Sequence, residues 1–251
     1  MATITAAIVA RDEERHIGAC LDTLAWADDL LVVLDDRSAD RTAEAAEAKG
    51  ARVATETFTT FPAQRNAALD LVTTPWVVFV DADERATPAL SREVRAAIAR
   101  TDSSAPAGYW IPRRNYIWGG WIRHGGWFPD YQLRLMNVAH ARYDERRDVH
   151  ELVELNGTAG HLIEPLIHYN YDCLGQFVAK QRVYSTLDAE RLAREGKRAR
   201  PHNFVLQPYR EFRRRFVELQ GHRDGWRGMA LASLLAWYTV VTYAKLARQK
   251  T

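Results

Sequence analysis

The sequence predicts an α/β fold in which a mostly parallel, doubly wound sheet is flanked by helices. Strand-like apolar runs end at Ala10, Asp35, about Thr55 and Asp81, and helical segments separate them. This strand–helix alternation is typical of a parallel sheet. With 251 residues and 47% hydrophobic side chains, the chain suits one large domain or a domain with an appendage.

Each helix expected in the first part of the chain has a recognisable periodicity or start. Residues 13–27 carry apolar side chains at i, i+3, i+4 and i+7 spacing. The next helix should begin near Asp40, which can cap it, and end at Gly50. Two more follow Phe61-Pro62 and Thr87-Pro88, because proline is favoured in the first turn of a helix.

The pattern changes after the fourth helix. Residues 108–171 combine short aromatic strands with glycine turns, and helical periodicity returns beyond Cys173. A charge-free stretch at 228–244 closes the chain. We therefore expect an α/β domain over residues 1–172 and a basic, amphipathic helical extension over residues 173–251.

Two carboxylates, Asp81 and Asp83, directly follow the apolar run 76–80. In α/β sheets ligands bind at the C-terminal ends of the strands. Mg²⁺ and Mn²⁺ favour one or two protein carboxylates, with water and phosphate oxygens in the remaining positions. The pair therefore suits a divalent cation held against a diphosphate, although such acids can also simply open a solvated loop.

Acidic residues also follow the first two strands. Asp12 and Glu13 come after the first strand, and Asp35 ends the second, where its carboxylate can accept hydrogen bonds from a nucleobase or a ribose. Ser38 and Asp40 are expected to cap the next helix. The three strand ends should converge at a topological switch point, where a nucleotide can lie.

The motifs at these strand ends resemble those of family-2 glycosyltransferases with the GT-A fold. They are Ile8-Val9-Ala10-Arg11-Asp12-Glu13-Glu14, Asp35-Asp36-Arg37-Ser38-Ala39-Asp40-Arg41-Thr42, Gln64-Arg65-Asn66 and Asp81-Ala82-Asp83-Glu84. The likeness continues through Pro129-Asp130-Tyr131-Gln132-Leu133-Arg134-Leu135, Val149-His150-Glu151, His168-Tyr169-Asn170-Tyr171 and the glycine-rich residues 221–228. This layout is similar to that of bacterial lipopolysaccharide-core β-1,4-glucosyltransferases. Asp12 stands where the family often has Asn, and Arg37 where glycine is common.

The resemblance implies a role for each strand-end residue in the catalytic domain. Asp35 would contact the base of a nucleotide-sugar, with Asp12 and Glu13 in the same binding region. Arg65 would help to hold the nucleotide, and Asp81 would lie near the ribose or a metal-bound water. The metal ligands would be Asp83 and His168, although a histidine that follows a strand is often structural.

An acceptor hydroxyl needs a general base to receive its proton. Glu151 is the first candidate and Asp130 the second; the alternative for Glu151 is a surface acid in a charged stretch. A single base and one-step displacement imply inversion of the anomeric configuration. Aromatic residues Trp118, Trp121 and Trp127 suit stacking on a sugar ring, or a core.

The composition of the C-terminal third of the chain suggests that it binds a membrane surface. Residues 191–215 contain nine Lys and Arg against two acids, and anionic lipids attract such segments. The charge-free stretch spans 17 residues, whereas a membrane crossing needs about 20, so we expect peripheral attachment to the inner face of the cytoplasmic membrane. The alternatives are packing on the domain or on a second copy. No nucleic-acid motif accompanies the arginines.

Together these observations predict an inverting, metal-dependent glycosyltransferase of the cytoplasm. It would move a sugar from a nucleotide-sugar, which the resemblance places in the UDP-hexose class, to a glycolipid acceptor such as lipopolysaccharide core. Transfer to polyprenyl phosphate or protein is the enzymatic alternative, and a non-catalytic membrane-surface adaptor with the same fold is the other. A nucleotidyltransferase would need a basic, glycine-rich loop where Asp12-Glu13-Glu14 stand.

Overall fold

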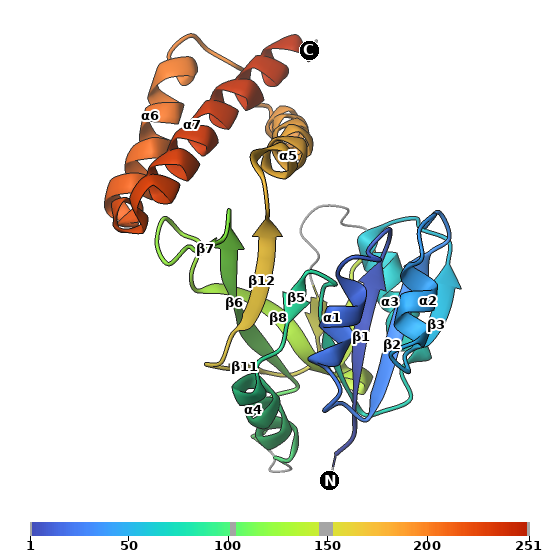
Figure 1. Ribbon diagram of the computed structural model, residues 1–251. Coiled ribbons are helices and arrows are strands. Elements are labelled where there is room, and N and C mark those ends of the chain that lie inside the picture. The colour runs from blue at the N-terminus through green and yellow to red at the C-terminus, as the bar shows by residue number, and fades with distance from the viewer. Residues whose placement is uncertain (1, 101–103, 146–152, 250–251) are drawn as a thin grey trace. The chain divides into compact units, whose positions relative to one another are not determined.

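The computed structural model describes residues 2–100, 104–145 and 153–249, and the chain divides into two compact units (Figure 1). The first comprises Met1–Arg113 and Tyr131–His168, and the second comprises Arg114–Asp130 and Tyr169–Thr251. Segment 114–130 thus belongs to the same unit as the C-terminal helices. The domain boundary expected at residue 172 stays a prediction.

The first unit is built on a mixed sheet with flanking helices. Its strands are β1 (Ile4–Ala10), β2 (Asp29–Asp35), β3 (Arg52–Glu56), β4 (Trp76–Phe79), β5 (Glu84–Arg85), β9 (Ala141–Tyr143), β10 (Val153–Leu155) and β11 (Ala159–His161). It also contains most of β6 (Gly108–Ile117) and β8 (Asp130–Asn137) and the first half of β12 (Leu166–Tyr171). Its helices are α1 (Ile17–Asp22), α2 (Thr42–Glu47), α3 (Phe61–Leu71), α4 (Pro88–Ile98) and the short 3₁₀ helix η1 (Val138–His140).

Strand order places the first four strands at one side of the sheet. The order is β3-β2-β1-β4-β8-β6-β12-β5, and β11 pairs with β6. Strands β1 to β4 pair with one another in parallel, whereas β8 runs antiparallel to β4. Separately, β9 and β10 form an antiparallel pair. The α/β sheet with flanking helices that the strand–helix alternation predicted is confirmed.

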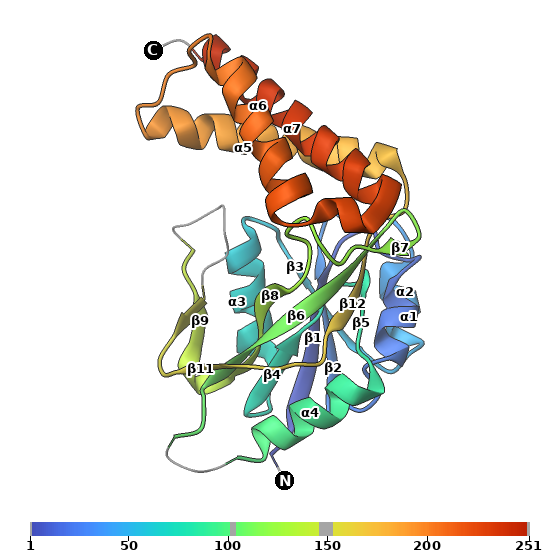
Figure 2. The same cartoon turned by 90° about the vertical axis from the view of Figure 1, so that its left-hand side faces the viewer.

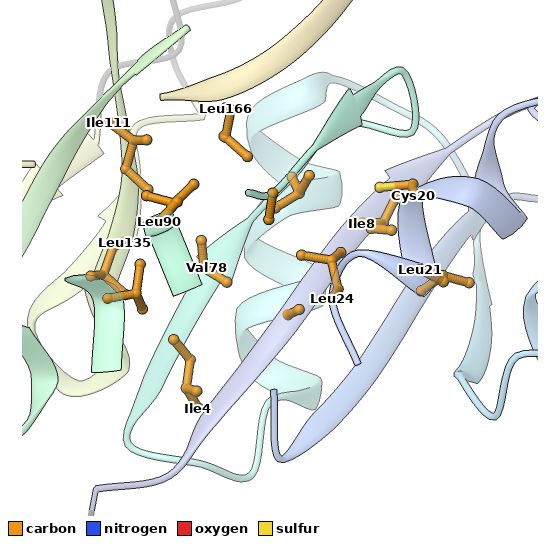
Figure 3. Close-up of a cluster of buried hydrophobic side chains, with 14 of the residues drawn as sticks. Ile4, Ile8, Cys20, Leu21, Leu24, Val78, Leu90, Ile111, Leu135 and Leu166 are labelled. Carbon is orange, nitrogen blue, oxygen red and sulfur yellow. The ribbon is translucent and has the colours of Figure 1, made fainter. Parts of the chain in front are cut away.

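Helices cover both faces of this sheet because successive strand residues point to opposite sides. Even-numbered residues of β1, such as Ile4 and Ile8, pack with α1, α2 and α4, as Figure 3 shows for part of the cluster. Residues of the other parity, such as Ala7, pack with α3, and Figure 2 shows α3 across the sheet from α1 and α2. Each large side chain buried in this way stabilises the fold by roughly 1.5–3 kcal/mol.

Helix starts agree with the sequence better than helix lengths do. Thr60 and Thr87 accept hydrogen bonds from the backbone N–H of Ala63 and Leu90, capping α3 and α4 as the proline positions indicated. Helix α1 is much shorter than the expected 13–27. Beyond Asp22 the backbone closes i to i+3 bonds, such as Leu24 N–H to Leu21 O at 2.9 Å, so the chain tightens out of the α-helical path.

The second unit is mainly helical. It contains β7 (Gly120–Trp121), α5 (Leu174–Arg194), α6 (Asn203–Arg213), the π-helical turn η2 (Arg214–Glu218), the 3₁₀ helix η3 (Gly221–Asp224) and α7 (Gly225–Arg248). Strand β7 pairs with the end of β6. Its core includes Ile117, Ile122, Phe177 and Leu231.

Two glycines of the segment 221–228 permit close backbone approach. A Cβ atom on Gly221 would lie 2.6 Å from the carbonyl oxygen of Arg215, and one on Gly228 would collide with the carbonyl oxygen of Gly221. Only glycine allows chain segments to pass this closely. The glycine-rich motif is therefore a packing element of the second unit.

The C-terminal helix presents apolar side chains to solvent. Trp226 and Trp237 are each 62% exposed, and Met229 is 45% exposed. Among the described residues, the helical stretch Gly221–Arg248 is the one segment long and apolar enough to cross a membrane by length and composition, and 22% of its most apolar window is buried. Length and composition alone do not distinguish a membrane span from a helix that lies on a surface.

Candidate functional site

An ionic cluster that includes the buried Glu84 and Arg134 forms where β4 ends. Oε2 of Glu84 accepts a hydrogen bond of 2.9 Å from the backbone N–H of Asp81, which closes the turn after the strand. Arg134 on β8 donates to both carboxylate oxygens of Asp81 and also contacts Oε1 of Glu84 at 3.2 Å. From α3, Arg65 donates to Oδ1 of Asp81 at 3.3 Å. The turn and both neighbouring elements thus fix the Asp81 carboxylate.

The charges of this cluster are set by burial and by the arginines. Burial raises the pKa of Asp81, but the positive charges of Arg134 and Arg65 outweigh it and hold the pKa well below its usual range. Burial raises the pKa of Glu84, because Arg134 and Arg113 offset only part of the desolvation. The two acids in turn raise the pKa of Arg134 well above its ordinary value. Asp81 is therefore a fixed negative charge.

The two expected metal ligands lie together. Nε2 of His168 is 3.3 Å from Oδ2 of Asp83. Strand pairing explains the meeting, because β12 runs antiparallel to β5 and sets His168 opposite Glu84 in the register. His168 is 7% exposed and Asp83 is 24% exposed in their side chains.

These two side chains fit a cation that takes few protein ligands. Within the described residues, no group of three or more His, Cys, Asp or Glu side chains could hold a metal ion. Mg²⁺ commonly uses one or two carboxylates and completes its coordination with water and substrate phosphates. A converging carboxylate oxygen and imidazole nitrogen therefore suit a metal that also binds a diphosphate.

The acidic ends of β1 and β2 are also brought together. Oδ1 of Asp12 accepts a hydrogen bond of 2.8 Å from the backbone N–H of Ala39, and Thr42 accepts one of 2.8 Å from the backbone N–H of Glu13. Asp12 adopts a φ of 53°, a left-handed conformation that Asn and Asp tolerate better than most residues. The loops after β1 and β2 thus form one connected edge of the sheet.

The carboxylate of Asp35 is already occupied within the protein. Its side chain is 3% exposed, and Arg37 donates to Oδ1 at 2.9 Å through Nε and to Oδ2 at 2.6 Å through Nη2. These hydrogen bonds hold the pKa of Asp35 well below its usual range. A nucleobase would have to share this carboxylate with Arg37. Arg37 is the residue that stands where the family commonly has glycine.

The two candidate bases are placed differently. Asp130 belongs to the second unit, where its Oδ2 accepts a hydrogen bond of 3.2 Å from Nδ2 of Asn115. Glu151 lies outside the described residues. Its role stays a prediction.

Sequence reasoning assigned no role to Arg134, Arg113 or Glu84, although the first and last stand in the quoted motifs. Glu84 is fully buried and Arg134 is 4% exposed. One signal was available: Arg134 is flanked by Leu133, Leu135 and Met136 on a strand. A charged residue in such an apolar run is rarely buried without a partner, so it predicts a buried carboxylate nearby.

Comparison with known proteins identifies the family. The family model described as glycosyl transferase family 2 matches residues 5–151, which include β1, β2, β4 and the cluster around Asp81. The chain belongs to glycosyl transferase family 2 and is a glycosyltransferase, as the motifs indicated.

Two relatives that match over most of their length are also named as glycosyltransferases. The chain is 28% identical over 254 residues to the lipopolysaccharide core biosynthesis glycosyltransferase LpsC of Rhizobium meliloti (strain 1021), covering 97% of this chain and 91% of LpsC. It is 23% identical over 258 residues to an uncharacterized glycosyltransferase of Rickettsia felis, covering 98% of this chain and 90% of that protein.

Solved structures give more distant matches. Glucosyl-3-phosphoglycerate synthase from Mycobacterium tuberculosis, in complex with Mn²⁺, UDP-glucose and phosphoglyceric acid, matches with a TM-score of 0.47 and 17% identity over 78% of this chain and 80% of that chain. TarS of S. aureus, in complex with UDP-GlcNAc, matches with a TM-score of 0.40 and 23% identity over 45% of this chain and 35% of that chain.

Proposed function

We propose that this glycosyltransferase is an inverting, metal-dependent enzyme that moves a hexose from a UDP-sugar to a glycolipid acceptor of the lipopolysaccharide-core type. The observation that carries the proposal is the convergence of Asp83 and His168 beside Asp81, where β4 ends in the first unit. The sequence similarity to a lipopolysaccharide core glycosyltransferase supports the acceptor class.

In this proposal the cluster around Asp81 holds the donor. Asp83 and His168 would hold Mg²⁺ or Mn²⁺, which neutralises charge on the diphosphate leaving group. Arg134 and Arg65 keep the Asp81 carboxylate ionised and in one position, so it can accept hydrogen bonds from the ribose or a bound water. Asp12, Glu13 and Asp35 border the same sheet edge and would contact the nucleoside.

The acceptor hydroxyl attacks the anomeric carbon as the bond to the diphosphate breaks, so the configuration inverts. Its proton passes to a carboxylate, for which we propose Glu151 first and Asp130 second. The hydrogen bond from Nδ2 of Asn115 to Oδ2 of Asp130 orients the Asp130 carboxylate.

We also propose that the enzyme works at the inner face of the cytoplasmic membrane. Of the nine basic residues in 191–215, Arg191, Arg213, Arg214 and Arg215 form ion pairs with acids. The other five make no ion pair with the described residues and are exposed: Arg194, Lys197, Arg198, Arg200 and Arg210. With the exposed indoles of α7, they supply both charge and apolar surface for an anionic membrane.

Transfer of labelled sugar tests the acceptor class. The enzyme is incubated with Mn²⁺ and radiolabelled UDP-glucose or UDP-galactose, together with truncated lipopolysaccharide, polyprenyl phosphate or a protein extract. Label in the lipopolysaccharide fraction alone supports the proposal. Label in polyprenyl phosphate or protein, with none in lipopolysaccharide, would replace the proposed acceptor.

A further inference from the structure

Two arginines lie over one indole ring in the second unit. The guanidinium carbon of Arg114, on β6, lies 4.3 Å from the ring centroid of Trp121 on β7, and that of Arg123 lies 4.2 Å from it. Neither arginine forms an ion pair with a carboxylate of the described residues. Two positive charges therefore lie beside one ring, and neither forms an ion pair within the described part of the chain.

Hydrogen-bond donors at this place lack acceptors. Nε of Arg114 and Nε1 of Trp121 are buried, and neither has a hydrogen-bond partner within the described part of the chain. A buried donor without an acceptor is unfavourable. An arginine stacked on an aromatic ring has its orientation fixed, while the edge of its guanidinium group remains able to bind an oxyanion. The two guanidinium charges and the donors without acceptors both make this place favourable for a negatively charged oxygen.

Asp224 of η3, an acid that contacts this segment, does not pair with the guanidinium group of Arg123. The carboxylate of Asp224 accepts hydrogen bonds from the backbone N–H groups of Arg123 and His124, at 3.2 and 2.8 Å, and lies 3.1 Å from Nδ1 of His124. Asp224 therefore fixes the backbone that carries Arg123, and the guanidinium group turns to Trp121 instead.

Aromatic rings continue the surface beside the arginines. Tyr116 is paired with Trp121 in the strand register, so both side chains lie on the same face of the hairpin. The ring of Tyr169 lies 5.8 Å from that of Tyr116 and the residue is 43% exposed. Aromatic faces pack against the apolar faces of sugars, so the surface combines features for a sugar ring and for a charged group.

We infer that Arg114, Trp121 and Arg123 form a binding site for an oxyanion carried by a saccharide, namely a phosphate ester or a carboxylate on the acceptor. The inference rests on the proposed transfer to a saccharide acceptor and adds that this acceptor is anionic. The guanidinium groups of Arg114 and Arg123 bind the oxyanion beside the indole ring of Trp121.

The indole N–H signal of Trp121 tests this site directly. The ¹⁵N-labelled protein, with the signal assigned by W121F, is titrated at constant ionic strength with glucose 6-phosphate, glucuronate, glucose and inorganic phosphate. We expect saturating shifts with the two anionic sugars, none with glucose, and at least ~10-fold weaker binding of inorganic phosphate, because it lacks the ring that meets the aromatic surface.

Variants separate the site from general charge effects. R114Q and R123Q should each weaken glucose 6-phosphate binding about 10-fold or more, since each removes a charge-assisted contact. Arg198 is an exposed arginine of the same unit that makes no ion pair with the described residues. The R198Q variant should leave the affinity for glucose 6-phosphate unchanged. Because Arg123 is the more exposed of the two, R123Q decides the result if R114Q does not fold.

Several outcomes would overturn the inference: equal shifts with glucose, binding of inorganic phosphate as tight as that of glucose 6-phosphate, or an equal loss in R198Q. UDP-sugar hydrolysis, measured in the same variants, should stay at the wild-type level because the site serves the acceptor. A wild-type protein that binds glucose 6-phosphate at Trp121 but never cleaves UDP-sugars would contradict the proposed function and leave this site standing.

Discussion

Nε2 of His168 lies 3.3 Å from Oδ2 of Asp83, although the two residues are 85 positions apart in the sequence. Antiparallel pairing of β12 with β5 produces this contact inside the first unit. The pairing also sets the histidine beside Glu84, whose carboxylate binds Arg134. The proposed metal ligands are thus positioned by strand register and by the ionic cluster.

The first prediction concerns the stability of that cluster. R134Q should lower the free energy of unfolding by about 3–5 kcal/mol, because it leaves Asp81 and the buried Glu84 without their main positive partner. Chemical denaturation measures the effect. R142Q is the matched control: it breaks the exposed Arg142–Asp70 pair and should cost less than about 1 kcal/mol. Equal effects of the two variants would show that the cluster does not stabilise the fold.

A second prediction concerns the glycine-rich segment of the second unit. G228A should destabilise the protein by about 1–3 kcal/mol, because the added methyl group meets the carbonyl oxygen of Gly221. G175A in α5 is the control, since its Cβ would have an ordinary contact of 3.6 Å to Sγ of Cys173, and alanine is favoured over glycine in helices. Thermal unfolding monitored by circular dichroism compares them. A G228A protein as stable as G175A would contradict the packing role.

Substitutions of the two candidate bases form the third prediction. Glu151→Gln should lower kcat by ~10² or more and change nucleotide affinity little, because the base acts on the acceptor proton. Steady-state kinetics and UDP binding are measured together for this variant and for Asp130→Asn. An active Glu151→Gln enzyme beside an inactive Asp130→Asn enzyme with normal UDP affinity assigns the base to Asp130. Activity in both variants would exclude both residues.

Membrane attachment gives the fourth prediction. The protein should sediment with anionic liposomes at low salt and be released at high salt, because several unpaired cations each contribute up to ~1 kcal/mol near such a surface. R194Q/K197Q/R198Q should reduce binding through charge, and W237S should reduce it through apolar contact of an indole that is 62% exposed. Both changes lie at exposed positions, so folding is preserved. Failure of the wild-type protein to bind at low salt would contradict the proposal.

The sequence predicted the elements better than it predicted the contacts among them. Strand ends at Ala10 and Asp35 and the start of α4 at Pro88 were correct, because apolar periodicity and capping residues are local signals. The antiparallel β8 and the register of β12 depend on pairing between distant segments, which periodicity does not encode. Family motifs, rather than periodicity, supplied His168.

Side-chain partners were the hardest to predict from sequence. Asp35 was expected to be available to a nucleobase, whereas Arg37 occupies both of its carboxylate oxygens. Arg134 was part of a quoted motif without a role, and its contacts with Asp81 cross 53 positions of sequence. Such pairings follow from the tertiary fold, because a buried charge selects whatever opposite charge the packing brings near.

Metal-dependent cleavage of the donor tests the central claim most directly. UDP-glucose or UDP-galactose hydrolysis is measured with Mn²⁺ and after removal of metal by EDTA, in the wild-type protein and in Asp83→Asn. The account predicts activity in the wild type that is lost with EDTA and restored by Mn²⁺, and a loss of at least ~10²-fold in Asp83→Asn with an unchanged circular dichroism spectrum. Full activity of Asp83→Asn under conditions where the wild type requires metal would contradict it.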